Sequence, residues 1–211
     1  MSLTIVLIIM TSIISYQAFS NADMRQKLIL HPASIKEFGQ WHRFLTHGFI
    51  HADWGHLILN MYVLYIFGED LEFYFNQVLG PMFGRLAYLF MYLTAIVLSS
   101  IPSYLRHQDN YGYSALGASG ATSAVVFGFV LFNPWLWFLF PPLPAIIFAV
   151  GYLWYSSYMD KRGGDNIGHN AHFWGSVYGL LFTITSMTFA KPEMLEFFVA
   201  RLLEGPSGLP F

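Results

Sequence analysis

The sequence predicts an all-α, polytopic membrane protein, a bundle of six transmembrane helices. Three observations lead to this prediction. Charged residues make up only 10% of the 211 residues, whereas soluble domains usually carry about 25%. Hydrophobic residues make up 55% of the chain. Apolar runs close to the roughly 17 to 25 residues that cross a bilayer as a helix recur along the whole chain.

The first three predicted helices occupy the N-terminal half. The first, 3–19, has no Lys or Arg before it and no small-residue cleavage site after it, which favours a membrane span over a signal peptide. The second, 55–73, carries His56 and Asn60 and ends in acidic residues. The third, 85–101, is a mainly apolar run.

The last three predicted helices follow a polar connection. The fourth, 119–133, is short for a full span, which favours a helix that begins below the membrane surface. The fifth is 143–159 and the sixth is 171–190. Because no internal repeat or low-complexity tract separates these segments, residues 1–211 are interpreted as a single membrane domain.

Composition excludes several chemistries. The chain has no cysteine, which rules out a thiolate nucleophile, a Cys-ligated metal and any disulfide. The net charge of −2 gives no indication of a nucleic-acid partner. The lipid bilayer is the partner that the composition implies, and the prediction includes no cofactor. Lys and Arg are more numerous in the connections opposite the termini, and this count alone favours external termini.

Polar residues inside an apolar helix are costly and are therefore functional candidates. His56 and Asn60 lie four residues apart in the stretch HADWGHLILN, so they share one helix face, and His47 and His51 have the same spacing. Three interpretations remain open from these residues alone. They are hydrogen bonding between helices, a polar cluster at a buried reaction centre, and a zinc site, since His at i and i+4 chelates zinc.

A second polar position opens the sixth predicted helix. The stretch GHNAHFWGSVYG contains His172, followed by Gly175 and Gly179 in a GxxxG pattern that permits close approach of another helix. The structural interpretation is a packing helix with an interfacial histidine. The functional interpretation is that His172 serves as a base.

The stretch LGASGATSA, 116–124, is rich in small residues, which often line helix contacts in membranes. Its alternative interpretation is a nucleophile at Ser119, because a hydroxyl becomes nucleophilic when a neighbouring base takes its proton. If the fourth and sixth helices touch through their small faces, Ser119 and His172 can meet. Free N–H groups at the helix start, with the side chains of Asn60 or His56, would then stabilise an oxyanion.

Three motifs, in this order on three separate predicted helices, resemble the rhomboid family of intramembrane serine proteases. They are His-x-x-x-Asn at 56–60, Gly-x-Ser-Gly at 117–120, and Ala-His-x-x-Gly-x-x-x-Gly at 171–179. The motif Arg-x-x-Thr-His-x-x-x-His at 43–51 and the stretch FGEDLE at 67–72 agree as well. The resemblance covers essentially the whole chain.

The resemblance implies a Ser–His dyad that cleaves transmembrane segments of single-span membrane proteins. Ser119 would attack the peptide carbonyl, and His172 would act as general base and then as acid. His56, Asn60 and the backbone N–H of Ser119 would bind the oxyanion, with no third carboxylate. Ser123, one turn deeper, is a lesser candidate nucleophile. The alternative is a catalytically silent relative that binds membrane clients, although such relatives usually lack the Ser or the His.

Two departures from the family pattern are visible. Many members carry Trp-Arg in the first loop, whereas here Trp41 and Arg43 are separated by one residue. Ser123 stands where some relatives have an aromatic residue that packs on the catalytic histidine. Another aromatic, such as Phe173 or Trp174, is then expected to hold that ring.

The family topology implies cytosolic termini, in the plasma membrane of a bacterium, which is opposite to the orientation that the charge count favours. Hydrolysis in a bilayer needs water, so a water-filled cavity with Ser119 at its floor is expected. The loop 160–170 contains Gly163-Gly164 and is interpreted either as a mobile cap over this cavity or as a plain connector.

Overall fold

The computed structural model describes residues 1–138, 142–162 and 168–206, and in these residues it is helical, with no β-strand. In chain order the elements are α1 (Leu3–Ser20), α2 (Ala22–Leu28), α3 (Pro32–Phe38), α4 (Arg43–Thr46), the 3-10 turn η1 (His47–Phe49), α5 (Trp54–Leu79), α6 (Pro81–His107), α7 (Ser119–Phe132), α8 (Ala145–Arg162), α9 (His169–Ala190) and α10 (Met194–Leu203).

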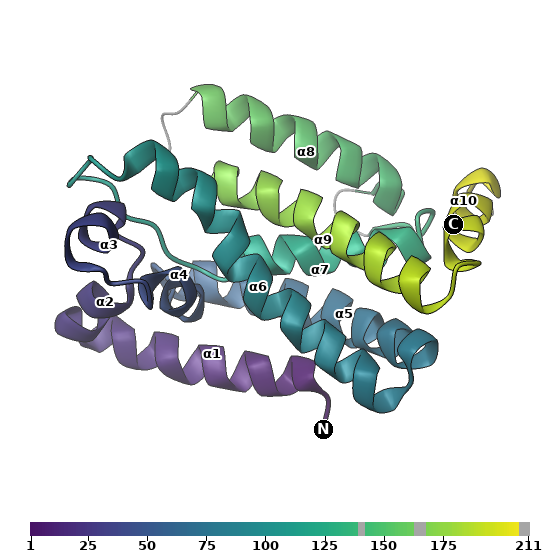
Figure 1. Cartoon of the computed structure of the whole chain (residues 1–211), viewed down its shortest axis with the longest axis horizontal. Coiled ribbons are helices and arrows are strands. Elements are labelled where there is room, and N and C mark those ends of the chain that lie inside the picture. Colours follow the sequence, from purple (N-terminus) through teal and green to yellow (C-terminus); the bar gives the residue numbers. More distant parts are fainter. Residues whose placement is uncertain (139–141, 163–167, 207–211) are drawn as a thin grey trace.

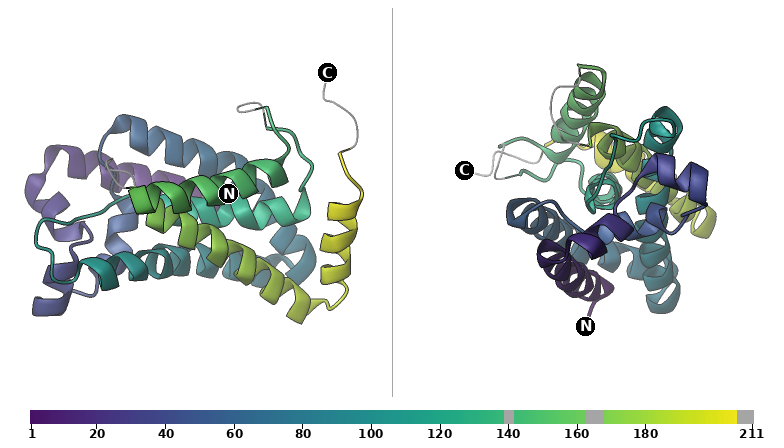
Figure 2. Two further views of the ribbon diagram at one scale, coloured as in Figure 1. Left: turned by 90° about the horizontal axis from the view of Figure 1, so that it is seen from above. Right: turned by 90° about the vertical axis from the view of Figure 1, so that its left-hand side faces the viewer.

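The long helices run roughly side by side in one bundle (Figure 1). The short helices α2, α3 and α4 gather at one end of the bundle, and α10 crosses the opposite end. Figure 2, in its end-on view, places α7 in the interior and α8 at the periphery. The connection that follows α1 therefore lies at the end of the bundle where α7 begins.

Each of the six predicted segments contains a helix, and α7 begins at Ser119 as predicted. Among the described residues, three helices are long and apolar enough to cross a membrane, namely α1, α6 and α9, and α7 is a shorter apolar helix. The 14 residues of α7 extend about 21 Å, less than the roughly 30 Å of a hydrocarbon core. The acidic end of α5 and the charged end of α8 lower their apolar character, so the six-span count stays a prediction.

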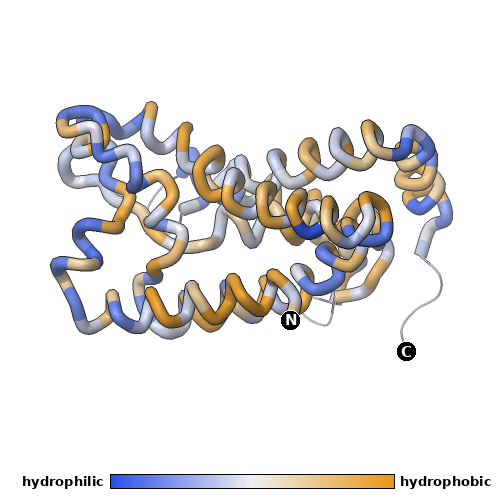
Figure 3. The backbone as a smooth tube through the Cα atoms, turned by 60° about the horizontal axis from the view of Figure 1, so that its bottom comes forward, coloured by the Kyte–Doolittle hydropathy of each residue, from blue (hydrophilic) through white to orange (hydrophobic). Residues whose placement is uncertain are grey.

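The hydropathy of the residues changes along the length of the bundle. Hydrophobic residues dominate the middle of the long helices, and hydrophilic residues gather toward the two ends (Figure 3). Many large apolar side chains face outward, among them Ile58, Phe90 and Trp154, which are each at least 60% exposed. An outer surface of this kind is unfavourable in water and suits contact with lipid.

Helices α7 and α9 pack through small residues. A Cβ atom on Gly175 would lie 2.1 Å from the carbonyl oxygen of Gly120, and one on Gly179 would lie 2.2 Å from that of Ala124. Both partners advance by four residues between these contacts, so the two helices run parallel and in register. The fourth and sixth segments therefore touch through their small faces, which is the condition under which Ser119 and His172 can meet.

The stretch FGEDLE anchors the start of α1. The Glu72 carboxylate accepts hydrogen bonds of 3.0 Å from each of the backbone N–H groups of Leu3 and Thr4. These N–H groups lack partners within their own helix, and an acidic group is favourable at this positive end of the helix dipole. The Tyr88 hydroxyl lies 2.9 Å from the Thr4 hydroxyl, so α1, α5 and α6 meet at one buried polar cluster.

The first connector, residues 21–53, is folded rather than extended. Its helices α2, α3 and α4 were not predicted from the sequence. The buried Arg43 guanidinium donates hydrogen bonds of 2.7 Å to the carbonyls of Gln26 and Ile29. The Thr46 hydroxyl donates to the Leu28 carbonyl at 2.8 Å. The Arg and Thr of the 43–51 motif thus satisfy the exposed carbonyls at the end of α2 and hold the connector together.

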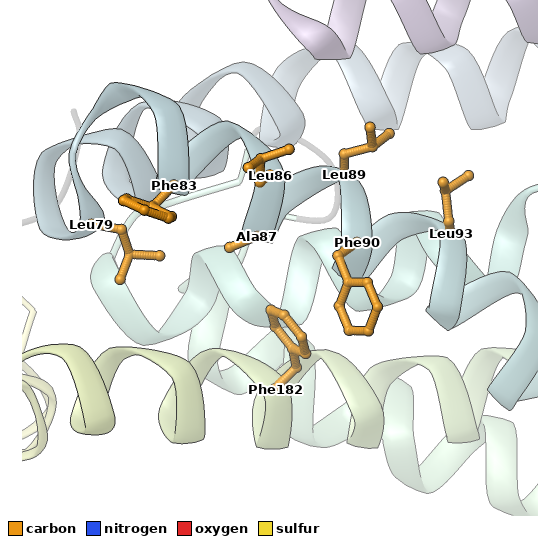
Figure 4. A pocket seen from close by; sticks show the side chains of 8 residues that line it. All are labelled: Leu79, Phe83, Leu86, Ala87, Leu89, Phe90, Leu93 and Phe182. Carbon is orange, nitrogen blue, oxygen red and sulfur yellow. The ribbon is translucent and has the colours of Figure 1, made fainter.

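An open apolar groove runs along α6, beside the end of α5 and the middle of α9 (Figure 4). Its volume is about 700 Å³, and its walls are Leu79, Phe83, Leu86, Ala87, Leu89, Phe90, Leu93 and Phe182. It contains none of the predicted site residues. The interpretation of the loop 160–170 as a cap depends largely on residues 163–167, which lie outside the described residues.

Candidate active site

Ser119 is the first residue of α7, and the residues before it are bound to the first connector. Leu30 and Ala115 exchange two backbone hydrogen bonds of 3.0 Å. The Gly117 N–H then donates to the His47 carbonyl at 2.9 Å. The backbone that leads into Ser119 is therefore fixed at two points by a segment that lies about 70 or more residues earlier in the chain.

The fully buried His51 provides a third anchor. Its Nε2 accepts the Ala118 N–H at 3.2 Å, which requires the proton to lie on Nδ1, and Nδ1 is 2.9 Å from the Ser15 hydroxyl. That hydroxyl in turn donates to the Phe49 carbonyl at 3.0 Å. Burial, and secondarily the proximity of His56, lowers the pKa of His51 to about 3, so the ring is neutral at physiological pH.

Gly117 and His56 are in direct contact. Gly117 has φ of 118°, a conformation that side-chain-bearing residues rarely adopt. A Cβ atom at this position would also lie 2.6 Å from Cε1 of the His56 ring. The ring therefore lies on the backbone two residues before Ser119. Its Nδ1 faces the Ala52 N–H at 3.4 Å, which favours the tautomer with the proton on Nε2.

Asn60 lies one helical turn further along α5 and is buried. Its amide nitrogen donates to the His56 carbonyl at 2.9 Å, and its Oδ1 accepts from the Thr122 hydroxyl at 3.1 Å. The Thr122 hydroxyl also lies 3.1 Å from the Ser119 carbonyl oxygen. The predicted oxyanion residues His56 and Asn60 are therefore both brought to the first turn of α7.

His172 lies in the first turn of α9, beside the first turn of α7. A Cβ atom on Gly120 would lie 3.5 Å from the carbonyl oxygen of Ala171, and one on Gly175 would lie 2.1 Å from the carbonyl oxygen of Gly120, so the residues next to Ser119 and His172 lie close together. Ser119 and His172 are both half-buried. The two first turns thus adjoin, and both side chains retain some access to their surroundings.

An aromatic ring stacks on His172, but it comes from α8. The ring centroids of Tyr152 and His172 are 6.0 Å apart, with an angle of 22° between the ring planes. Phe173 and Trp174, which were expected to hold this ring, instead form an edge-to-face pair with each other. The Tyr152 hydroxyl lies 3.3 Å from the Ser123 hydroxyl. The expectation that Phe173 or Trp174 holds the histidine therefore finds no support here, and Tyr152 occupies that position.

The remaining histidines of the first connector do not gather around a common point. His47 is buried between α4 and α6, and this burial lowers its pKa to about 4, against a partial rise from the carbonyls of Ile96 and Phe44. In residues 1–138, 142–162 and 168–206, no three His, Cys, Asp or Glu side chains form a group able to hold a metal ion. The zinc interpretation of these histidines is therefore not supported by the arrangement.

Three residues of the site have no signal in the sequence. Ser15, Thr122 and Tyr152 bind or stack on predicted site residues from α1, α7 and α8. Ser and Thr inside apolar helices occur at many other positions of this chain, and aromatic residues line all its spans. Only their spatial partners distinguish these three from the rest.

Comparisons with known proteins find one family model and two relatives. A family model described as the rhomboid domain matches residues 38–189. RHOMBOID-like protein 12, mitochondrial, of Arabidopsis thaliana is 26% identical over 176 residues, 77% of this chain and 51% of that protein. Putative rhomboid protease YdcA of Bacillus subtilis is 30% identical over 94 residues, 44% of this chain and 42% of that protein. The chain thus aligns with about half the length of these relatives.

Proposed function

The chain belongs to the rhomboid family, and we propose that it is an intramembrane serine endopeptidase with Ser119 as nucleophile and His172 as general base. The observation that carries this proposal is the contact between the first turns of α7 and α9. A Cβ atom on Gly175 would lie 2.1 Å from the Gly120 carbonyl oxygen, and Ser119 and His172 lie in the first turns of α7 and α9, within one turn of these closely packed residues. Hydrogen bonds between catalytic groups often tighten only when substrate is bound, so adjoining turns are a sufficient starting geometry.

The chemistry follows from these two side chains. The Ser119 hydroxyl attacks the scissile carbonyl carbon while its proton passes to the His172 imidazole. The resulting tetrahedral intermediate collapses when that proton passes to the leaving amine, which breaks the C–N bond and leaves an acyl group on Ser119. A water molecule, deprotonated by His172, then hydrolyses the ester and releases the second product.

The oxyanion of the intermediate would lie at the N-terminus of α7. The first N–H groups of a helix have no partner within it and carry the positive end of the helix dipole. The Nε2 atom of His56 lies close to the backbone at Gly117, where a Cβ atom would be 2.9 Å from it, and Asn60 retains a second amide proton beyond the one given to the His56 carbonyl. Preorganised donors of this kind are often the largest contribution to catalysis of acyl transfer.

The proposed substrates are single-span membrane proteins that unwind locally near the membrane surface, because carbonyls within an intact helix are shielded by hydrogen bonds. The protein itself is proposed to be a single domain over 1–211, with six spans and cytosolic termini in a bacterial plasma membrane. One relative comes from a bacterium, and the plant relative is named as mitochondrial. Water would reach Ser119 through a cavity open to one side.

Two readouts on the purified protein in detergent or liposomes test the proposal. We expect wild type to cleave a model single-span substrate and to react with a fluorophosphonate probe. Ser119→Ala and His172→Ala should lose both activities, while Ser114→Ala, which removes an exposed hydroxyl from the preceding connection, should keep both. Probe labelling that survives Ser119→Ala would show that another serine is the nucleophile.

A catalytically silent role is the alternative, since the Arabidopsis relative is named as rhomboid-like rather than as a protease. In that role the protein would bind membrane clients without cleaving them. Wild type would then bind the model substrate, leave it intact and fail to react with the probe. Loss of cleavage upon addition of EDTA would instead indicate a metal-dependent reaction, which a Ser–His dyad does not require.

A further inference from the structure

Tyr152 contacts the proposed base from a helix that carries none of the reacting groups. Its ring lies 6.0 Å from the His172 ring at an interplanar angle of 22°, an offset stacked arrangement within the range at which aromatic rings attract one another. Building on the proposed function, we infer that Tyr152 is a positioning residue that orients the His172 imidazole toward Ser119.

The Tyr152 ring is itself held on several sides. Its hydroxyl lies 3.3 Å from the buried Ser123 hydroxyl, one turn beyond Ser119 on α7. The Phe148 ring, one turn earlier on α8, stacks on it at 5.6 Å, and the Phe127 ring of α7 lies 6.0 Å away. A ring restrained in this way provides a fixed surface against which the His172 imidazole packs.

Such a surface matters because a histidine side chain rotates about two bonds. A general base must keep one ring nitrogen directed at the hydroxyl that it deprotonates, and small misplacements are costly in rate. Tyr152 lies against one side of the His172 ring and so removes part of that rotational freedom before substrate arrives. Because the ring belongs to α8, the orientation of the base depends on the position of that helix.

Steady-state cleavage of a model single-span substrate by matched variants tests this inference. Tyr152→Ala removes the ring that packs against His172, and we expect kcat to fall about 10-fold with KM within about twofold of wild type. Tyr152→Phe keeps the ring and should stay within about twofold in both constants. The control is Tyr158→Ala, because Tyr158 lies on the same helix, is 49% exposed and stacks on Trp154 instead of on His172.

Each other outcome would overturn the inference. An unchanged kcat in Tyr152→Ala would remove the positioning role, and an equal loss in Tyr158→Ala would assign the effect to general damage of α8. A raised KM with unchanged kcat would assign Tyr152 to substrate binding. A loss in Tyr152→Phe as large as in Tyr152→Ala would assign the effect to the hydroxyl. A wild type without cleavage activity would reject both the proposed protease function and this inference. If wild type cleaves the substrate, the variants test the role of Tyr152 alone.

Discussion

The two helices α7 and α8 are both apolar and both contact α9, yet they are packed very differently. Twelve of the 14 residues of α7 are buried, whereas only three of the 18 residues of α8, Ala145, Ala149 and Ser156, are buried. The helix that carries the proposed nucleophile is thus surrounded by protein. The helix that carries the ring against the proposed base lies at the periphery, and most of its residues are partly or fully exposed to their surroundings, which in a membrane are lipid.

This difference in burial indicates how the protein combines a fixed position for the proposed nucleophile with access of substrate to the site. The start of α7 is bound to the first connector through His47 and His51, and its flank is pressed against α9 without intervening side chains. Reacting groups are most effective on rigid supports. A peripheral helix such as α8 has fewer buried residues that oppose its displacement, so local opening is expected to cost less free energy at α8 than at α7.

The largest effect is expected at the contact of α7 with α9. Gly175→Ala would place a Cβ atom 2.1 Å from the Gly120 carbonyl oxygen. Relieving this clash requires a shift of the backbone, which costs more free energy than a shift of a side chain. We expect a loss of about 3 kcal/mol in the free energy of unfolding, at the upper end of overpacking. Thermal unfolding in detergent, followed by circular dichroism, measures this loss.

Gly151→Ala on α8 is the matched control for that measurement. A Cβ atom at Gly151 would have no neighbour within 4 Å. The same substitution is therefore expected to raise stability by up to ~1 kcal/mol, because Ala favours helix more than Gly does. Equal destabilisation by both substitutions would contradict the distinction between the buried and the peripheral helix.

The second effect is expected where the first connector meets α7. Gly117→Ala would place a methyl group against the His56 ring and would strain a backbone with φ of 118°. Because this backbone leads directly into Ser119, we expect the rate of cleavage to fall about 100-fold. Gly112→Ala in the same connection, where the Cβ would meet only Asn110 at 3.4 Å, should cleave normally. An active Gly117→Ala would show that this backbone tolerates displacement.

How far the sequence predicts this molecule can be seen at Ser119 and Tyr152. A run of small residues after a polar loop, followed by apolar residues, was enough to predict that a helix begins at Ser119. The GxxxG at 175–179 indicated close approach of another helix, and that helix is α7. These features work because helix periodicity and small-residue packing are local properties of the chain.

Tyr152 was not predictable in the same way. Its neighbours on α8 include Trp154, Tyr155 and Tyr158, aromatic residues that are each 46% or more exposed, and nothing in their order marks the one that turns inward. The sequence pointed to Phe173 and Trp174 because they are adjacent to His172 in the chain. Adjacent residues on a helix face different directions, so sequence proximity was a poor guide to ring contact.

The third effect is a loss of stability in acid, and it arises at the anchored side of the site. Burial lowers the pKa of His51 to about 3, whereas the unfolded chain has a value of about 6.5. Between these two values the unfolded chain binds a proton that the folded chain excludes. The stabilisation from neutral His51 is therefore complete above about pH 6.5 and decreases as the pH falls toward 3.

The size of this third effect is about 2 kcal/mol for His51 between pH 6.5 and pH 5. His51→Gln, which keeps an acceptor but does not titrate, should show a shallower decrease in the unfolding midpoint over this range. The buried His47 contributes a decrease of the same sign, because its pKa is lowered to about 4, and it remains in both proteins. Identical acid profiles for wild type and His51→Gln would indicate that His51 accepts its proton without breaking the bond from Ala118.

The smallest effect is expected for Ser123→Ala, at the point where α7 meets α8. This substitution removes the hydroxyl that lies 3.3 Å from the Tyr152 hydroxyl but leaves the ring packed between Phe127 and Phe148. A single neutral hydrogen bond contributes about 1 kcal/mol or less, so we expect cleavage within about threefold of wild type. Fluorophosphonate labelling should be retained in Ser123→Ala and absent in Ser119→Ala. If labelling instead disappears only in Ser123→Ala, the nucleophile lies one turn deeper in the membrane, and the anchoring of the backbone before Ser119 serves the fold rather than the reaction.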